Sequence, residues 1–145
     1  MTKPFILLVD DETSFIETMS KRLQKREFNV MTAASGREAL DVLRVNRSLD
    51  VVILDVKMPG MDGIETLQAI KKEFPLVEVI MLTGHATIES AIDGMKTGAF
   101  DYLMKPCDID QLIAKVLDAG RKKQEHAQRM EQAQLEKIMS TKGIG

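Results

Sequence analysis

Five charged or polar residues suited to metal and phosphate chemistry each follow a short apolar run. Asp10 and Asp11 follow the first run, Asp55 the third, Thr83 the fourth and Lys105 the fifth. Three carboxylates, a hydroxyl and an ammonium could together hold a divalent cation and a phosphoryl group. They lie far apart in the chain, so this chemistry depends on a fold that brings the ends of the runs together.

The apolar runs have the length and composition of buried β-strands. The predicted strands are Phe5–Val9, residues 28–34, Val51–Leu54, Val77–Leu82 and residues 100–104. Segments with apolar residues at helical spacing separate them. This alternation predicts an α/β domain with a doubly wound parallel sheet. Right-handed crossovers place the carboxyl ends of all strands at one edge, where such sheets bind ligands, so we expect the five polar residues to meet there.

Composition excludes several classes of protein. The chain has 145 residues, a net charge of −2 and one cysteine. A near-neutral chain lacks the basic footprint of nucleic-acid binding, and one cysteine excludes an internal disulfide. No signal peptide opens the chain and no apolar run is long enough to span a membrane. We therefore expect a cytoplasmic protein without direct contact to nucleic acid or membrane.

Four segments resemble the signature motifs of response-regulator receiver domains of two-component systems. They read LLVDDE, VVILDVKMPGMDG, VIMLTGHA and FDYLMKP, and the likeness extends from about Phe5 to about Leu117. It implies a flavodoxin-like (βα)5 fold of strand order 2-1-3-4-5 over residues 1–120. The stretch GHATIESAIDGMKTGAFDYLMKP further resembles receivers that precede sigma-54-dependent activator domains.

The resemblance also implies how the site works. Asp55 would accept a phosphoryl group, Asp10 and Asp11 would form the metal-binding pair with it, and Lys57 would lend its backbone carbonyl to the metal. Mg²⁺ suits such a site because crowded carboxylates repel one another and Mg²⁺ prefers oxygen ligands. The donor would be a phosphohistidine on a sensor histidine kinase or a phosphotransfer protein. The protein would be a switch that catalyses only its own phosphorylation and dephosphorylation.

Further residues would stabilise the phosphoryl group and transmit the signal. Lys105, predicted to begin a cis peptide with Pro106, would bind phosphate, and Thr83 would be the switch hydroxyl. Tyr102 would be the switch aromatic. The short helix over residues 87–96, interrupted by a glycine, would move together with the strand 100–104 and the last helix. We expect that face to be the output surface and a candidate homodimer surface.

Residues 121–145 form a helical extension or linker in this prediction. Their apolar residues give only a broken stripe. A solvated helix, a dimerising helix and a linker toward a further domain are all compatible with this pattern.

Three other functions fit parts of the sequence. A Mg²⁺-dependent phosphohydrolase with an Asp nucleophile would need a substrate-recognition cap, and no insertion of that size is present. A flavin-binding electron carrier would need a hydroxyl-rich phosphate loop after the first strand, where this chain has Asp-Asp-Glu. A phosphorylation-independent interaction module would not need the acidic residues.

Overall fold

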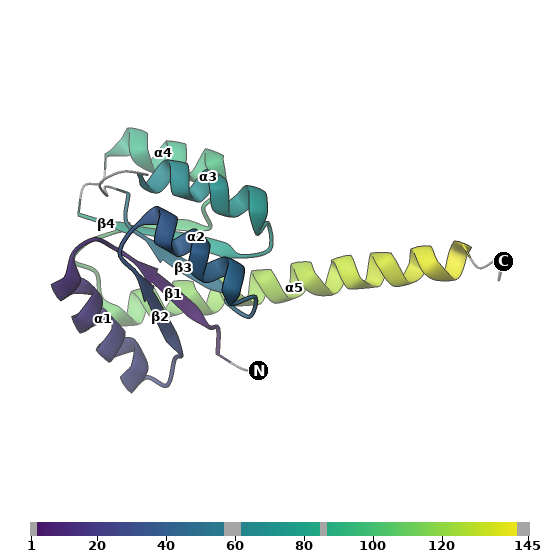
Figure 1. The fold of residues 1–145 in the computed structure, drawn as a ribbon, viewed down its shortest axis with the longest axis horizontal. Helices are drawn as coiled ribbons and strands as arrows, with labels where there is room; N and C mark the ends of the chain where they lie inside the picture. Colours follow the sequence, from purple (N-terminus) through teal and green to yellow (C-terminus); the bar gives the residue numbers. More distant parts are fainter. Residues whose placement is uncertain (1–2, 57–61, 85–86, 142–145) are drawn as a thin grey trace.

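The computed structural model describes residues 3–56, 62–84 and 87–141, and these form one parallel sheet with helices on both faces (Figure 1). The strands are β1 (Ile6–Val9), β2 (Val30–Ala33), β3 (Val51–Leu54), β4 (Glu78–Thr83) and β5 (Asp101–Met104). Their order in the sheet is β2-β1-β3-β4-β5. This arrangement confirms the predicted flavodoxin-like fold and its strand order.

Helices cover the sheet in two layers. They are α1 (Thr13–Lys25), α2 (Gly36–Val45), α3 (Gly63–Glu73), α4 (Ile88–Thr97) and α5 (Ile109–Thr141). In Figure 1, α2, α3 and α4 lie on one side of the sheet, toward the front and the top of the view, and α5 runs behind it. The strand period of two divides the core accordingly, because Ile6 and Leu8 pack with α1 and α5 while Leu7 and Val9 pack with α2 and α3.

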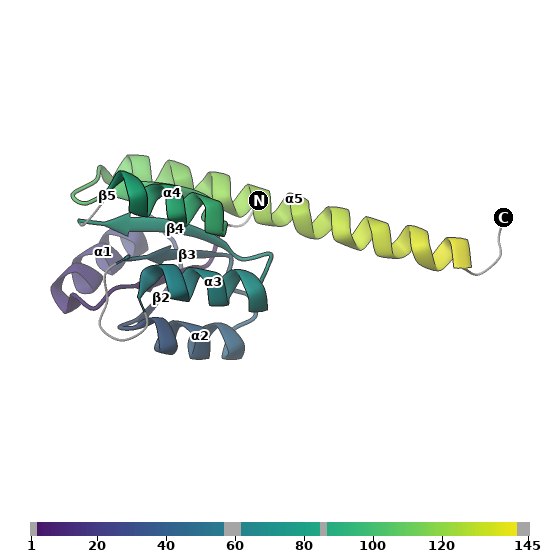
Figure 2. The ribbon, with the colours of Figure 1, turned by 90° about the horizontal axis from the view of Figure 1, so that it is seen from above.

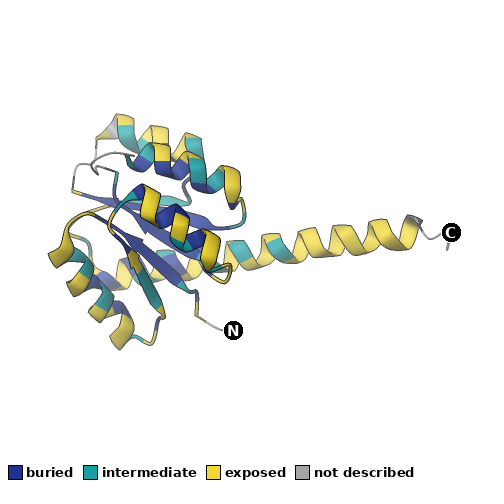
Figure 3. Cartoon of the chain, in the orientation of Figure 1, coloured by how far each residue is buried: buried dark blue, intermediate teal, exposed yellow. Residues whose placement is uncertain are grey.

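The strands with the longest apolar runs are buried on both faces. Every residue of β1, β3 and β4 is buried, whereas the edge strand β2 is partly exposed (Figure 3). Several predicted strand boundaries differ from the observed ones by one or two residues, and two of these differences have a clear cause. β2 starts at Val30 rather than Phe28, because Phe28 donates its N–H to Leu23 in the turn after α1. β4 continues through Thr83, which pairs with Met104 of β5.

Local side chains determine where most helices begin. Ser35 and Asp62 each accept a hydrogen bond from the first turn of α2 and α3. Thr87 and Ser90 form a reciprocal capping box on α4, and Gly98 ends that helix in the left-handed conformation at φ 115°. Although its internal glycine weakens α4, both of its ends are therefore capped.

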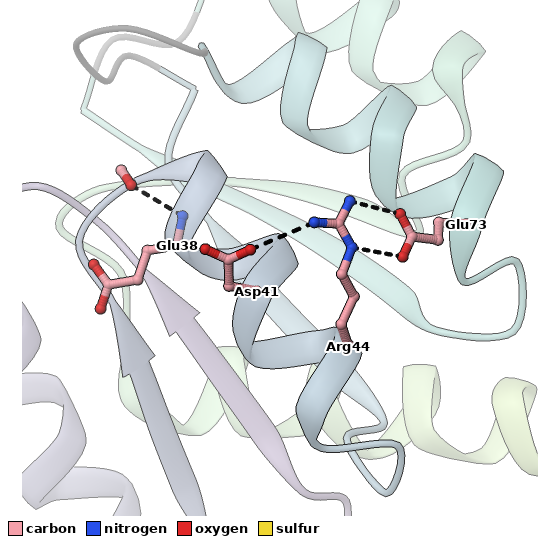
Figure 4. Close-up of polar contacts among 5 residues, drawn as sticks. Glu38, Asp41, Arg44 and Glu73 are labelled. Atoms are coloured by element: carbon pink, nitrogen blue, oxygen red, sulfur yellow. Dashed lines mark hydrogen bonds and ion pairs between the residues drawn. The ribbon is translucent and has the colours of Figure 1, made fainter.

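An exposed ion pair connects α2 to α3. Arg44 donates to both carboxylate oxygens of Glu73 at 2.8 and 2.9 Å and to Asp41 at 3.4 Å (Figure 4). The two-point geometry is the stronger arrangement for a guanidinium and a carboxylate. These residues hold the outer ends of the two helices together on the solvent side of the front layer.

Helix α5 is much longer than the sheet that it covers. Its 33 residues correspond to about 50 Å at 1.5 Å per residue. Asp108 caps it, accepting a hydrogen bond from the Asp110 N–H at 2.8 Å. Beyond residue 120 the helix continues without a break away from the domain, and this part is almost entirely exposed (Figures 2 and 3). None of the described helices is both long and apolar enough to cross a membrane.

Candidate acidic metal site at the carboxyl edge of the sheet

Register places two of the predicted carboxylates on adjacent strands. Val9 and Leu54 are paired residues at the ends of β1 and β3, so Asp10 and Asp55 follow them side by side. Both residues are buried, with exposed fractions of 1% and 3%. Asp11 is exposed, yet carboxylate oxygens of Asp10, Asp11 and Asp55 all lie within 4.8 Å of one another. The three acids predicted to form the metal site are therefore brought together.

Lys105 reaches the same pocket from the end of β5. Its Nζ lies 2.5 Å from Asp10 Oδ2, 3.4 Å from Glu12 Oε1 and 3.9 Å from Asp55 Oδ2. The backbone aligns it, because the Lys105 N–H donates to the Thr83 carbonyl at 2.9 Å and so ties the ends of β4 and β5 together. The Lys105–Pro106 peptide is cis, as predicted. One ammonium thus faces three carboxylates.

Burial and charge act in opposite directions on these groups. Burial raises the pKa of Asp10, and the nearby Asp55 carboxylate raises it further, against the hydrogen bonds from Lys105 and from the Glu12 N–H. Burial alone would lower the pKa of Lys105, but its hydrogen bond to Asp10 and the surrounding carboxylates raise it instead. The lysine therefore stays charged, and the pocket favours an additional positive charge, either a proton or a cation.

Asp10 and Asp11 do not cap the helix that follows them. The N-cap of α1 is Glu12, and no side chain accepts a hydrogen bond there. Asp10 Oδ1 instead accepts from the Glu12 N–H at 3.0 Å, one residue before the helix. Asp10 therefore does not serve as the cap of α1. An absent side-chain cap costs a helix about 1 kcal/mol, so this sequence favours the pocket over the stability of α1.

Two contacts of Lys105 were not predicted from the sequence. The Phe15 ring lies 3.9 Å from Nζ, measured to the ring centroid, in a cation–π contact, and Glu12 adds a third acid. Glu12 adjoins the Asp-Asp pair and so was visible in the sequence. Phe15 belongs to an ordinary helical apolar pattern, and only the fold reveals that it lies beside a charge.

The predicted switch residues lie on the α3–α4 side of this edge. Thr83 is fully buried as the last residue of β4. Tyr102 is half-buried, and its hydroxyl lies 3.0 Å from Ser90 Oγ, an atom of the α4 capping box. Sequence reasoning missed Ser90, because a serine inside a helix gives no signal of a partner on a strand. The predicted carbonyl ligand Lys57 lies outside the described residues.

The donor set suits a hard divalent cation. Carboxylate oxygens are the ligands that Mg²⁺ accepts, and this ion keeps several of its waters. Asp10 and Asp55 are buried and Asp11 is exposed, so the three acids present carboxylate oxygens both inside the domain and at its surface. By the chemistry of these donors, Mg²⁺ fits the residues that are present.

Known proteins are similar to this chain in sequence and in fold. The chain matches the family described as "Response regulator receiver domain" over residues 6–117. It is 44% identical over 109 residues to the transcriptional regulatory protein ZraR of Escherichia coli O157:H7 and 38% identical over 116 residues to the DNA-binding transcriptional regulator NtrC of Klebsiella pneumoniae. These matches cover 75% and 80% of the chain but 24% of each relative. The chain therefore spans about a quarter of the length of these relatives.

Solved structures of related proteins have a similar fold. A response regulator receiver domain protein from Clostridium thermocellum superposes with a TM-score of 0.79 at 39% identity, covering 83% of this chain and 97% of that one. NtrX from Brucella abortus has a TM-score of 0.81 at 29% identity, covering 90% of this chain and 29% of that one.

Proposed function

The chain belongs to the response regulator receiver domain family, and from that membership we propose that Asp55 is its phosphoryl acceptor. Members of this family signal by phosphorylation of an aspartate. The observation that carries the assignment is the burial of Asp55 beside Asp10, with Lys105 Nζ 3.9 Å from its carboxylate. An acid in this position has a cationic group ready to offset the charge that a phosphoryl group adds.

The transfer is a nucleophilic substitution at phosphorus. A carboxylate oxygen of Asp55 attacks the phosphorus of a phosphohistidine on a sensor histidine kinase or phosphotransfer protein. The new O–P bond forms as the P–N bond breaks, and the imidazole nitrogen leaves with the electron pair and takes up a proton. Small acyl phosphates can act as donors by losing a carboxylate instead. Attack of water on the phosphorus later releases inorganic phosphate and restores Asp55, so the chain is a switch and not an enzyme for external substrates.

Asp10, Asp11 and Asp55 would hold Mg²⁺, together with the backbone carbonyl of Lys57. When bound, the ion supplies positive charge against the carboxylates and the phosphoryl oxygens. The Lys105 contact at 2.5 Å favours the ionised form of Asp10 against the effect of burial, and Lys105 would also interact with the same phosphoryl oxygens. Asp10 is thus both a ligand and the anchor of the phosphate-binding lysine.

Intact mass spectrometry tests the acceptor. After incubation with acetyl phosphate or phosphoramidate and Mg²⁺, the protein should gain one phosphoryl mass, and EDTA should prevent it. Asp55→Asn should abolish the gain because only the nucleophilic oxygen is lost. Asp50→Asn, at the opposite edge of the sheet, is the matched control and should be labelled normally. Full labelling of the Asp55→Asn variant would refute the assignment.

We place the output surface on α4, β5 and the part of α5 beside them. Its support is a set of apolar side chains exposed in this layer: Ile92 and Met95 on α4 are 47% exposed and Met104 on β5 is 58% exposed. Such side chains favour contact with a partner or a second copy of the chain. Phosphorylation draws the Thr83 hydroxyl toward the new oxygens, and Tyr102 on the neighbouring strand follows.

Hydrogen exchange tests this route. Phosphorylation should change exchange over residues 87–104 in the unsubstituted protein. Thr83→Ala should still be labelled but should show little change in that range, since the hydroxyl that responds to phosphate is gone. Equal exchange changes in both proteins would mean that the signal leaves by another route.

The chain spans about a quarter of the length of ZraR and NtrC, which supports a proposal that it acts as part of a larger regulator. We propose that residues 121–145 are an extension or linker toward an output domain of the sigma-54-dependent activator kind. In such a protein DNA contact belongs to the output domain, and the receiver, with its overall charge of −2, makes none itself.

A further inference from the structure

The amino edge of the sheet carries a second row of acids, each paired with a lysine of α5. Asp50 precedes β3, while Glu78 and Asp101 begin β4 and β5. The pairs are Lys123–Asp50 at 2.7 Å, Lys122–Glu78 at 3.3 Å and Lys115–Asp101 at 2.5 Å. This edge lies opposite the phosphoryl-acceptor site, and the proposed phosphorylation chemistry uses none of these residues.

The positions of two lysines follow from the helical repeat of α5. Leu112, Val116 and Ala119 form the buried stripe that packs α5 on the sheet. Lys123 continues that stripe one turn further, where the strands begin and the apolar surface ends. Lys122 lies beside it. The helix therefore changes from apolar to ionic contacts at the point where it leaves the sheet.

Glu78 is the most buried acid of this row. Its exposed fraction is 3%, and it alternates with Ile80 and Leu82, which face α5. Lys122 binds it from α5, and Lys71 of α3 binds it at 3.2 Å from the other layer. A buried carboxylate is costly without a partner, so both lysines are held near it.

Asp50 joins the start of the chain to the same part of α5. Its Oδ2 accepts the Phe5 N–H at 2.8 Å while its Oδ1 accepts Lys123 Nζ. Pro4 lies directly against Gly120, where an added Cβ would come within 2.4 Å of the proline ring. The N-terminal segment, β3 and β4 thus all contact α5 within one turn.

We propose that the pairs Lys122–Glu78 and Lys123–Asp50 form a latch that sets the direction in which residues 121–141, the arm, leave the domain. A helix of this length is stiff, so the direction of the arm depends on how firmly its root is held. Lys122 and Lys123 are positioning residues in this role. The arm carries Met130, Leu135, Ile138 and Met139, each about half exposed, at a fixed orientation to the domain. The latch acts whether or not Asp55 is phosphorylated.

Distance measurements between two spin labels test the latch in the unphosphorylated protein without Mg²⁺. On a Cys107→Ser background, labels are attached after Arg37→Cys on α2 and Gln134→Cys on the arm, both exposed positions. The latch variant combines Lys122→Gln with Lys123→Gln. The matched control combines Arg121→Gln with Arg129→Gln, which removes the same charge from the arm. Within the part of the chain that the structure describes, the ion pair of Arg121 is with Asp118 of its own helix.

The unsubstituted background and the control should each give one narrow distance peak, and the latch variant should lose it. Its helical circular dichroism should stay unchanged, because the arm changes direction by a bend at its root and does not unwind. The variant should fold, since Glu78 keeps Lys71 and Asp50 keeps the Phe5 N–H. If it does not, Lys122→Gln and Lys123→Gln are measured singly, and each should broaden the peak. A narrow peak in the latch variants, a broad peak in the background or a loss of helicity would each overturn the proposal.

Discussion

The two edges of the sheet both carry acids and lysines, but in opposite proportion. Among the described residues, the carboxyl edge sets Asp10, Asp11, Glu12 and Asp55 against one lysine, Lys105. The amino edge sets Asp50, Glu78 and Asp101 against Lys71, Lys115, Lys122 and Lys123. Acids exceed lysines at one edge, and lysines exceed acids at the other. An excess of carboxylates favours the binding of a cation, whereas carboxylates that are each paired with a lysine form structural contacts.

This difference in charge balance suits the carboxyl edge to binding a cation and the amino edge to holding helix α5 in place. At the carboxyl edge, burial and the Asp55 charge raise the pKa of Asp10, so the ionised form of the pocket is unfavourable and a bound divalent cation would stabilise it. At the amino edge each acid already has its counter-ion, and added metal has little to offset. Three predictions test this contrast, and a fourth adds an exposed ion pair of the helix layer for comparison.

The largest expected effect is the response to Mg²⁺. At about 100 times its Kd, Mg²⁺ should raise the free energy of unfolding by about 2.7 kcal/mol. Asp11→Ala should remove this gain because the ion loses a carboxylate ligand, while Glu78→Gln at the other edge should keep it. Urea titrations with Mg²⁺ and with EDTA measure both. A normal gain in Asp11→Ala would place the ion elsewhere.

Glu78→Gln should lower the free energy of unfolding by about 2 kcal/mol, without Mg²⁺. The substitution leaves two lysines without their shared, almost fully buried carboxylate. Chemical denaturation measures the loss, and Glu125→Gln on the exposed arm is the control for removing one acid. A loss as small as that of the control would mean that the amino edge contributes no stability.

Asp55→Asn should change stability in the opposite direction. Without Mg²⁺ it should raise the free energy of unfolding by about 1 kcal/mol, since it removes repulsion with Asp10 while Lys105 keeps its contact with Asp10. The same urea titration in EDTA compares it with Glu78→Gln. If both variants were destabilised, the two edges would not differ in charge balance as inferred.

The smallest effect concerns the exposed pair Arg44–Glu73, which lies at neither edge. The Arg44 hydrogen bond lowers the pKa of Glu73 below its ordinary value of 4.5. A lowered pKa in the folded state gives stability that is present above the ordinary value and lost as pH falls through the lowered one. The difference in unfolding midpoint between the unsubstituted protein and Glu73→Gln should therefore be small near neutral pH and vanish in acid. A difference that grew in acid would contradict the sign.

Much of the site could be predicted because parallel strands end at a common edge. The positions of Asp10, Asp55 and Lys105 after apolar runs were enough to expect their meeting, and the structure brings them together. The burial of Asp55 also follows from the sequence, since it extends a strand that is apolar throughout. Phe15 and Ser90 were missed because each contacts a residue from a distant strand, and no local pattern reports such a contact.

The sequence by itself determined the elements, their alternation and the acids at the carboxyl edge. Periodicity and apolar runs specify these features locally. The right-handedness of the crossovers then places the carboxyl ends of all strands, and the acids that follow them, at one edge of the sheet. Only the tertiary structure decided that Lys122 and Lys123, which read as part of a polar tail, bind acids of β4 and of the segment before β3. Whether a charged side chain is solvated or paired depends on which strand passes beneath it, and that is a property of packing rather than of spacing.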